Sequence, residues 1–388
     1  MSPSRTGGAL FSDNCKPRPI LLQCGMLNPV QVHYQSYPYP HYPLLASVRR
    51  CDTYALNLEA LWMRFNRRLP PPEARKILIA GCGTFAPYPC SVANPDAAIT
   101  ALDLSERSLQ RARLHCLLHG CRNVEYRCGD LMDCASIAGN YGLIDSYGVL
   151  HHLDDPLAGL KILAQRLVPG GMVRIMLYSR YARREEEAIR HALRLLDIRT
   201  PQMARKLLKG ARPGSRLARY LKTSDEAWSD VGLADALLHP RVRTYRIDEL
   251  LEIVARVGLQ PLLFTHPGAR ESVAEEIDRL RLLEKERRSP GNFVLYLGAT
   301  AVHPPPDRRD SLIVLNPCLI TVVSRIKLGT VHILPRIGCE NTPLRWEERR
   351  FLRQFIVPQR RSSLARDSAR IIDSYKRRLF LLEYDEAG

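Results

Sequence analysis

The sequence of 388 residues contains no run of about 18 apolar residues, which is the length that a membrane-spanning helix needs. Its N-terminus lacks the apolar stretch of roughly 7 to 15 residues that marks a secretory signal peptide. No internal repeat is present. These absences predict a cytoplasmic protein without a membrane span.

Metal-binding patterns are also missing, although the chain contains 11 cysteines. No C-x-x-C occurs, and no set of Cys and His residues has zinc-finger spacing. The closest pairs are Cys116 with Cys121 and Cys128 with Cys134. We therefore expect no metal site, and we expect most thiols to be reduced and to pack as small hydrophobic groups.

The composition is that of a folded, basic protein. Hydrophobic residues make up 45% of the chain and charged residues 25%, which suffices to fill a core and excludes disorder throughout. The length suits two or three domains. The formal net charge of +17 makes an anionic partner worth considering.

Much of this charge lies between Arg174 and Lys222, where 14 Lys and Arg residues accompany 4 Asp and Glu. We expect this stretch to belong to a basic, mostly helical insert over residues 180–240. Three interpretations stay open: a solvated helical face, a wall that binds an anionic small acceptor, and a surface for nucleic acid. Nucleic acid is the least favoured, because few aromatic side chains are interleaved with the charges.

Short apolar segments alternate with amphipathic segments from residue 70 onward. Such an alternation predicts an α/β fold with a parallel, doubly wound sheet, which binds its ligand at the carboxyl ends of the strands. The expected strands are 76–82, 98–104, 124–128, 143–150, 172–178, 259–264 and 293–297, and the expected helices are 105–120, 156–168 and 247–258.

The same pattern divides the chain into parts. The expected parts are residues 1–69, with an irregular leader, a Tyr/Pro segment and a helix; residues 70–300, the α/β domain; and residues 301–388, a small accessory domain.

The accessory domain begins with a linker over 303–310, HPPPDRRD. One helix is expected to start at Thr342 and Pro343, and another to run over 368–382. These features suggest a small winged-helix or peptide-binding module.

The Tyr/Pro segment reads VHYQSYPYPHYPLL and begins at Val32. Proline restricts the backbone, and tyrosine offers a flat ring with a polar tip. Two interpretations are open: a stiff flap that lies over a ligand, or a strap that packs on the surface.

The turn after the first expected strand indicates a cofactor. Gly81 and Gly83 let the backbone approach a nucleotide closely, and Asp103, 20 residues beyond Gly83, ends the next strand. With Ala86 the turn formally satisfies a dinucleotide pattern. Prolines at 87 and 89 follow at once and argue against a regular helix there, and so against a pyrophosphate.

Five motifs occur in order: ILIAGCGTF, ALDLS, CGDLMD, SYGVLHHLDDP and LVPGG. Together they resemble the successive motifs of class I S-adenosylmethionine-dependent methyltransferases over residues 75–180, and more weakly over 240–300. The resemblance implies a Rossmann-like, seven-stranded, mostly parallel sheet and S-adenosylmethionine as the cofactor. The Tyr/Pro segment also resembles a bacterial subgroup that is often fused to other domains.

The resemblance also implies roles for particular residues. Asp103 would bind the ribose hydroxyls, and Asp130 would accept a hydrogen bond from the adenine amino group. The sequence departs from the family pattern at Phe85, where a third glycine is usual. The implied cofactor-binding residues are Gly81, Cys82, Gly83, Asp103, Leu104, Gly129, Asp130, Leu131, Tyr147 and Gly148.

Methyl transfer mainly requires that the protein position a nucleophile, and a base is needed only when the accepting group carries a proton. The candidates for that base are His151, His152 and Tyr147, although packing and helix capping are the favoured explanation for the two histidines. We therefore expect a methyltransferase that acts on a small-molecule or peptide-borne acceptor. The alternatives are an NAD-dependent oxidoreductase and a non-catalytic binding protein on a methyltransferase scaffold.

Overall fold

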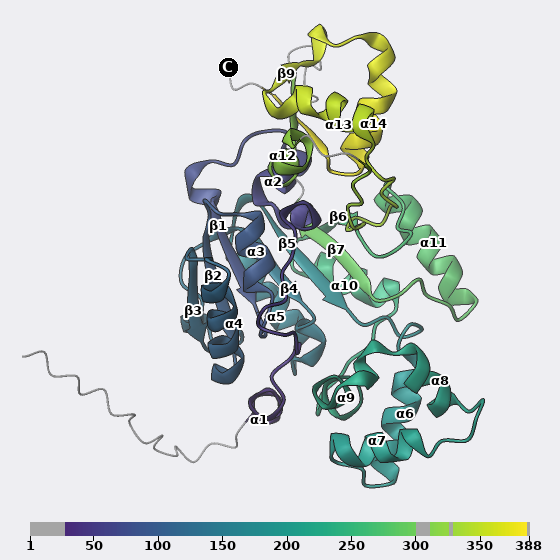
Figure 1. The fold of residues 1–388 in the computed structure, drawn as a ribbon. Helices are drawn as coiled ribbons and strands as arrows, with labels where there is room; N and C mark the ends of the chain where they lie inside the picture. Colours follow the sequence, from purple (N-terminus) through teal and green to yellow (C-terminus); the bar gives the residue numbers. More distant parts are fainter. Residues whose placement is uncertain (1–27, 300–310, 326–328, 386–388) are drawn as a thin grey trace, which may run out of the picture.

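The computed structural model describes residues 28–299, 311–325 and 329–385. The expected irregular leader and the expected linker at 303–310 lie outside these residues. Within the described part, a seven-stranded sheet forms the centre, a helical insert lies to one side and a C-terminal module lies at one end (Figure 1).

The sheet has the order β3-β2-β1-β4-β5-β7-β6. Neighbouring strands from β3 to β5 are parallel, whereas β7 is antiparallel to both β5 and β6. This confirms the predicted doubly wound, mostly parallel fold. The strands are β1 (Lys76–Ala80), β2 (Ala98–Asp103), β3 (Val124–Cys128), β4 (Tyr141–Tyr147), β5 (Leu167–Leu177), β6 (Gln260–Phe264) and β7 (Phe293–Gly298).

Helices cover both faces of the sheet, because alternate side chains of each strand point to opposite sides. Ile77 and Ile79 of β1 belong to the core on one face, whereas Leu78 and Ala80 belong to the core on the other. The first core includes side chains of α2 (Leu58–Asn66), α3 (Pro87–Ala93) and α4 (Glu106–Leu118); the second includes side chains of α5 (Pro156–Gln165), α10 (Ile247–Arg256) and α11 (Val273–Lys285).

The expectation that the prolines at 87 and 89 would prevent a helix was wrong. Helix α3 begins at Pro87, only a few residues after the glycine turn. Both prolines lie in its first turn, where backbone N–H groups have no partner within the helix, so their missing N–H groups cost little. The helix is short and ends at Ala93.

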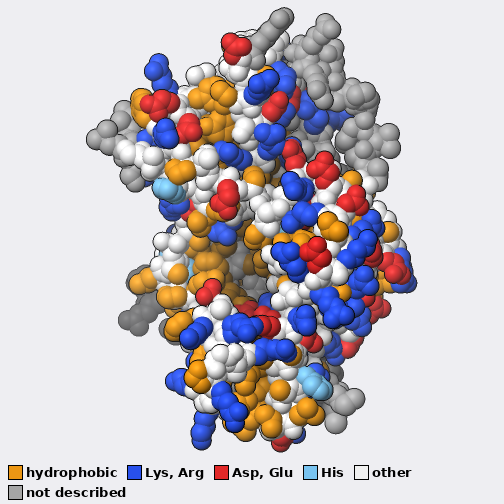
Figure 2. Space-filling model, turned by 90° about the vertical axis from the view of Figure 1, so that its right-hand side faces the viewer, with side chains coloured by type: hydrophobic (Ala, Val, Ile, Leu, Met, Phe, Trp, Pro, Cys, Tyr) orange, Lys and Arg blue, Asp and Glu red, His pale blue; other side chains and the backbone are white. Residues whose placement is uncertain are grey.

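The insert is helical and has a small core of its own. Many of its arginines form ion pairs with carboxylates, for example Arg205 with Asp230 and Arg219 with Glu185. On the face shown in Figure 2, basic side chains are scattered among acidic and apolar ones and form no continuous basic field. Its helices are α6 (Arg184–Leu195), α7 (Pro201–Lys209), α8 (Arg216–Thr223) and α9 (Asp230–Leu233).

The C-terminal module contains a three-stranded antiparallel sheet with the order β10-β8-β9. The strands β9 and β10 both pair with β8, so they do not form the hairpin of a winged helix. Its elements are β8 (Ser311–Leu315), α12 (Ile320–Ser324), α13 (Trp346–Arg353), β9 (Gln359–Arg360), α14 (Ala369–Arg377) and β10 (Leu381–Asp385).

The expected helix over 368–382 was too long. Helix α14 ends at Arg377, and Leu379 adopts a left-handed φ of 59°. Strand β10 then follows at Leu381 because it pairs with β8, about 70 residues earlier in the chain. The module shares one core with the sheet domain: the ring of Phe380 packs edge-on against Tyr54, with ring centroids 5.3 Å apart.

Candidate functional site

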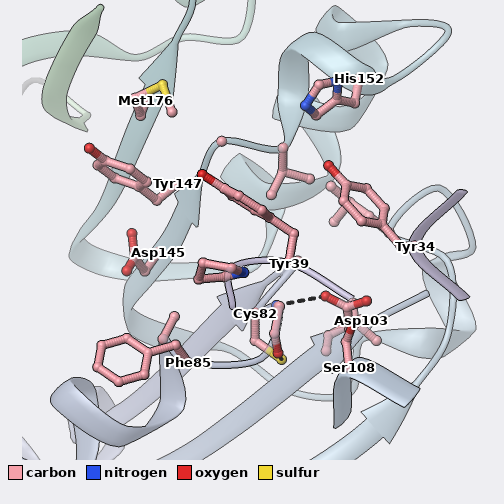
Figure 3. A pocket seen from close by; sticks show the side chains of 18 of the residues that line it. Tyr34, Tyr39, Cys82, Phe85, Asp103, Ser108, Asp145, Tyr147, His152 and Met176 are labelled. Atoms are coloured by element: carbon pink, nitrogen blue, oxygen red, sulfur yellow. Dashed lines mark hydrogen bonds between the residues drawn. The ribbon is translucent and has the colours of Figure 1, made fainter. Parts of the chain in front are cut away.

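A cavity of 760 Å³ opens at the carboxyl ends of β1, β2 and β4. The glycine turn after β1 forms its floor, and the Tyr/Pro segment covers it (Figure 3). Arg183, Glu226 and Asp235 of the helical insert also line it. All ten residues that the motifs assign to the cofactor line this one cavity: Gly81, Cys82, Gly83, Asp103, Leu104, Gly129, Asp130, Leu131, Tyr147 and Gly148.

The glycine turn has no room for side chains. Gly81 and Gly83 have φ values of 73° and 55°, a region that favours glycine. A Cβ atom on Gly83 would lie 2.5 Å from the carbonyl oxygen of Tyr39, and one on Gly81 would lie 2.4 Å from a methyl group of Val149. The bare backbone of the turn therefore faces the cavity.

Asp103 is buried at the end of β2 and is held by the turn. One carboxylate oxygen accepts a hydrogen bond from the backbone N–H of Gly83 at 2.7 Å (dashed line in Figure 3), and the other accepts one from Ser105 at 2.8 Å. Burial raises the pKa of Asp103 to about 6, although these two hydrogen bonds oppose that shift. A carboxylate has about four acceptor positions, so it can still accept hydrogen bonds from a diol in the cavity.

The Tyr/Pro segment lies over the cavity, as a flap would. The backbone N–H of Thr84 donates to the carbonyl of Tyr39 at 3.1 Å, and the Thr84 hydroxyl donates to the carbonyl of Pro40. Helix α1 (Pro29–Ser36) leads into the segment, and the Ser105 hydroxyl donates to the Tyr34 carbonyl at 3.1 Å. We call residues 34–43 the flap. Its tyrosines 34, 39 and 42 all line the cavity.

Phe85, which replaces the usual third glycine, also faces the cavity. Its ring packs against Tyr42 of the flap at a centroid distance of 4.4 Å and edge-on against His115 of α4 at 5.1 Å. The flap therefore accommodates the bulky side chain, and Phe85 helps to hold it in place.

The three candidate bases occupy different positions. Tyr147 ends β4 at the cavity, with the guanidinium of Arg174 over its ring at 4.6 Å. His152 also lines the cavity, but burial lowers its pKa to about 3, which makes it a weak proton acceptor. His151 is fully buried against the ring of Tyr178, 3.8 Å between centroids, and is not among the lining residues. Its position does not support a catalytic role.

The cavity also contains charged side chains that no sequence motif indicated. Asp145 pairs with Arg174 at 3.2 Å, on adjacent strands β4 and β5. Arg183 pairs with Glu226 at 3.1 Å, and Asp235 accepts a hydrogen bond from the Tyr34 hydroxyl at 3.0 Å. Asp145 and Arg174 were detectable as charges inside apolar strands, whereas nothing in the sequence marked Glu226 and Asp235 of the insert.

Burial raises the pKa of Asp235 to about 7, and the negative charge of Glu226 adds to the shift.

In the part of the chain that the structure describes, no group of three His, Cys, Asp or Glu side chains is arranged to hold a metal ion. No described helix is long and apolar enough to cross a membrane.

Comparison with known proteins places this site in context. A family described as "Methyltransferase domain" matches residues 77–171. An uncharacterized protein from Synechococcus sp. is 30% identical over 251 residues, which cover 61% of this chain and 59% of that protein. The ubiquinone biosynthesis O-methyltransferase of Bordetella avium is 35% identical over 102 residues, which cover 26% of this chain and 42% of that enzyme.

The chain thus spans about half the length of these relatives. Among solved structures, PKMT2 from Rickettsia typhi in complex with AdoHcy has a TM-score of 0.55 and 15% identity, over 89% of this chain and 77% of that one. At this low sequence identity, the similarity shows a shared fold alone.

Proposed function

The chain belongs to the class I S-adenosylmethionine-dependent methyltransferases, and from this premise we propose that it transfers a methyl group to a small-molecule or peptide-borne acceptor. One observation carries the proposal. The ten residues that the motifs assign to the cofactor come from separate loops, yet all of them line a single cavity. The cytoplasmic location stays a prediction.

The residues of the cavity fit this cofactor. The carboxylate of Asp103 would accept hydrogen bonds from the two ribose hydroxyls, and Asp130 would accept one from the adenine amino group. Leu104 and Leu131 would flank the adenine ring. Gly81 and Gly83 would lie along the ribose and methionine, where a side chain on either would collide with its neighbours.

The cofactor supplies a methyl group that is already activated, so the protein has to exclude water and position the acceptor. The flap covers the cavity from above, and Tyr147 and Gly148 lie at the end where the methionine part would be bound. A nucleophile held within about 3 to 3.5 Å of the methyl carbon would gain most of its rate from this positioning.

The two alternatives are separable by experiment. Because α3 does form, the prolines no longer argue against a dinucleotide, and the choice of cofactor is supported instead by the family. Calorimetry with S-adenosylmethionine and with NAD distinguishes the methyltransferase from the oxidoreductase. Tritium transfer from labelled cofactor into a fractionated extract distinguishes the enzyme from a non-catalytic binding protein, which would bind the cofactor and label nothing.

The decisive variant is Asp103→Ala. Loss of a buried, charge-assisted hydrogen-bond acceptor costs about 1.5–3 kcal/mol per bond, so the affinity for S-adenosylmethionine should fall at least ~100-fold in calorimetry. Asp154→Ala is the matched control, because Asp154 also lines the cavity but is mostly exposed. Unchanged affinity in Asp103→Ala, with circular dichroism showing a folded protein, would remove the proposal.

A further inference from the structure

The lining of the cavity is acidic, although the chain is basic. It contains eight carboxylate side chains and four guanidinium groups, and no lysine. Two of the carboxylates, Asp103 and Asp130, belong to the part assigned to the cofactor. The remaining lining still has more carboxylates than guanidinium groups, so the net charge of +17 does not describe the space that an acceptor would enter.

Each guanidinium group of the lining is already engaged. Arg174 pairs with Asp145, Arg183 with Glu226 at 3.1 Å, and Arg241 with Asp154 at 2.5 Å. The fourth, Arg336, donates to the backbone carbonyl of Asp52 at 3.2 Å. Three of the four positive charges of the lining are thus already balanced by a carboxylate in contact.

Asp235 differs from the other carboxylates of the lining. It is 4% exposed and lies in the helical turn Ala234–Leu238 of the insert. Among the described residues, its hydrogen-bond donor is the neutral hydroxyl of Tyr34, and no Lys or Arg forms an ion pair with it. Its second carboxylate oxygen accepts no hydrogen bond from the described residues. Asp103 has no cationic partner either, but its two oxygens accept from backbone N–H groups and it belongs to the part assigned to the cofactor. Asp235 is thus the buried carboxylate without a described cationic partner on the side left to an acceptor.

Tyrosines surround this carboxylate. Tyr34 contacts it directly, and Tyr39 and Tyr178 are close enough for its charge to raise the pKa of both phenols. Arg183 and His151 stack on the ring of Tyr178, and His239 packs on the ring of Tyr34 with centroids 5.3 Å apart. Both Tyr34 and Tyr39 of the flap nevertheless line the cavity. Aromatic rings beside a carboxylate favour an organic cation.

We propose that Asp235 and the flap tyrosines Tyr34 and Tyr39 form the binding site for the acceptor, and that the acceptor carries a protonated amine. The ammonium nitrogen has no lone pair, so it anchors the molecule while another atom of the acceptor takes the methyl group. An ammonium group supplies the cation that Asp235 lacks, and its N–H groups suit a carboxylate oxygen without a partner. This inference deepens the proposed function and rests on it. It also replaces the anionic acceptor that the charge of the insert suggested.

Three probes of similar size test the proposal: benzylamine, benzyl alcohol and benzoate. Each is titrated at neutral pH into the full chain saturated with AdoHcy and followed by ligand-observed NMR. A charge-assisted hydrogen bond is worth about 1.5–3 kcal/mol, so benzylamine should bind at least ~10-fold more tightly than benzyl alcohol. Benzoate should bind most weakly. Equal binding of benzylamine and benzyl alcohol, or tightest binding of benzoate, would overturn the proposal.

Asp235→Asn keeps an oxygen that accepts from Tyr34, so the variant should fold, bind AdoHcy as before and lose the preference for benzylamine. Asp154→Asn is the control and should keep that preference. If Asp235→Asn instead lowers the affinity for S-adenosylmethionine but not the affinity for AdoHcy, the carboxylate interacts with the sulfonium of the cofactor. The proposal is then wrong. If the unaltered chain fails to bind AdoHcy, the proposed function itself fails, which is a different result.

Discussion

Two buried carboxylates of the cavity show how burial and hydrogen-bond partners set the pKa of a residue. Asp103 accepts hydrogen bonds from two backbone N–H groups, and burial raises its pKa to about 6. Asp235 accepts one from a phenol, and burial raises its pKa to about 7. Ionisation of either carboxylate costs stability, because each is buried and neither has a cationic partner in contact.

This predicts a pH-dependent effect of Asp235→Asn. The groups that act on Asp235 are Glu226, which raises its pKa, and Tyr34, Arg183 and Arg190, which lower it. Because the pKa in the folded state exceeds the unfolded value, the folded chain binds more protons between about pH 4 and 7, and its stability falls as pH rises through that window. Asparagine does not ionise, so the variant should gain stability relative to the wild type over this window.

The expected gain between pH 5 and pH 8 is at least about 1 kcal/mol, which is about 1 °C in Tm for a chain of this length, measured by differential scanning calorimetry at both pH values. Asp103 contributes equally to both proteins and cancels in the comparison. A difference in Tm that is the same at pH 5 and pH 8 would contradict the assigned pKa.

At the scale of elements, the glycine turn and the flap form one unit. The turn approaches the flap so closely that the carbonyl of Tyr39 occupies the place of a Gly83 side chain, and Thr84 donates two hydrogen bonds to the flap. Phe85 extends this contact by packing on Tyr42. The floor and the cover of the cavity are therefore coupled.

Gly83→Ala tests this coupling. A Cβ atom would push the flap away from the turn, so the affinity for AdoHcy should fall ~10-fold or more and backbone amides of the flap should exchange hydrogen faster. Gly120→Ala is the matched control, because Gly120 also has a positive φ, 74°, but no atom lies within 4 Å of a Cβ there. It should cost only about 1 kcal/mol in stability. Equal effects of the two variants on AdoHcy binding would refute the coupling.

The elements themselves were largely predictable, because apolar periodicity and capping residues are local signals. Ser105 and Asp155 cap α4 and α5 with their side chains, as the sequence suggests. The errors have physical causes. Prolines are compatible with the first turn of α3, and the strand character of 381–385 depends on pairing with a distant segment.

At the scale of the whole molecule, the C-terminal module and the sheet domain share a hydrophobic core. Tyr54 packs on Phe380, and the side-chain amide of Asn316 donates to the carbonyl of Tyr54 at 3.2 Å. Strand β10 also lies against α2, and the backbone N–H of Asp385 donates to the carbonyl of Arg67 at 2.7 Å. We therefore expect the two parts to unfold together.

Phe380→Ala should lower the stability of the whole chain by about 3–5 kcal/mol, since it opens a cavity in a fully buried site. Calorimetry should show one transition at a lower Tm, and AdoHcy should raise that Tm as it does in the wild type. Ile371→Ala is the control in the same module, because Ile371 is 49% exposed and its loss should change little. Two separate transitions, only one of which moves in Phe380→Ala, would show that the parts unfold independently.

The sequence by itself determined the alternation of strands and helices, and it predicted ten residues for the cofactor, all of which line the cavity. Those residues sit in short turns at strand ends, where local spacing dictates their position. Only the tertiary structure decided the part of the cavity that we propose for the acceptor. Tyr34 and Asp235 are 201 residues apart, and they meet because the flap and the insert both line the cavity at the same edge of the sheet. The same packing pairs the arginines of the lining, so a basic chain encloses an acidic cavity, a result that counting charges along the sequence does not reveal.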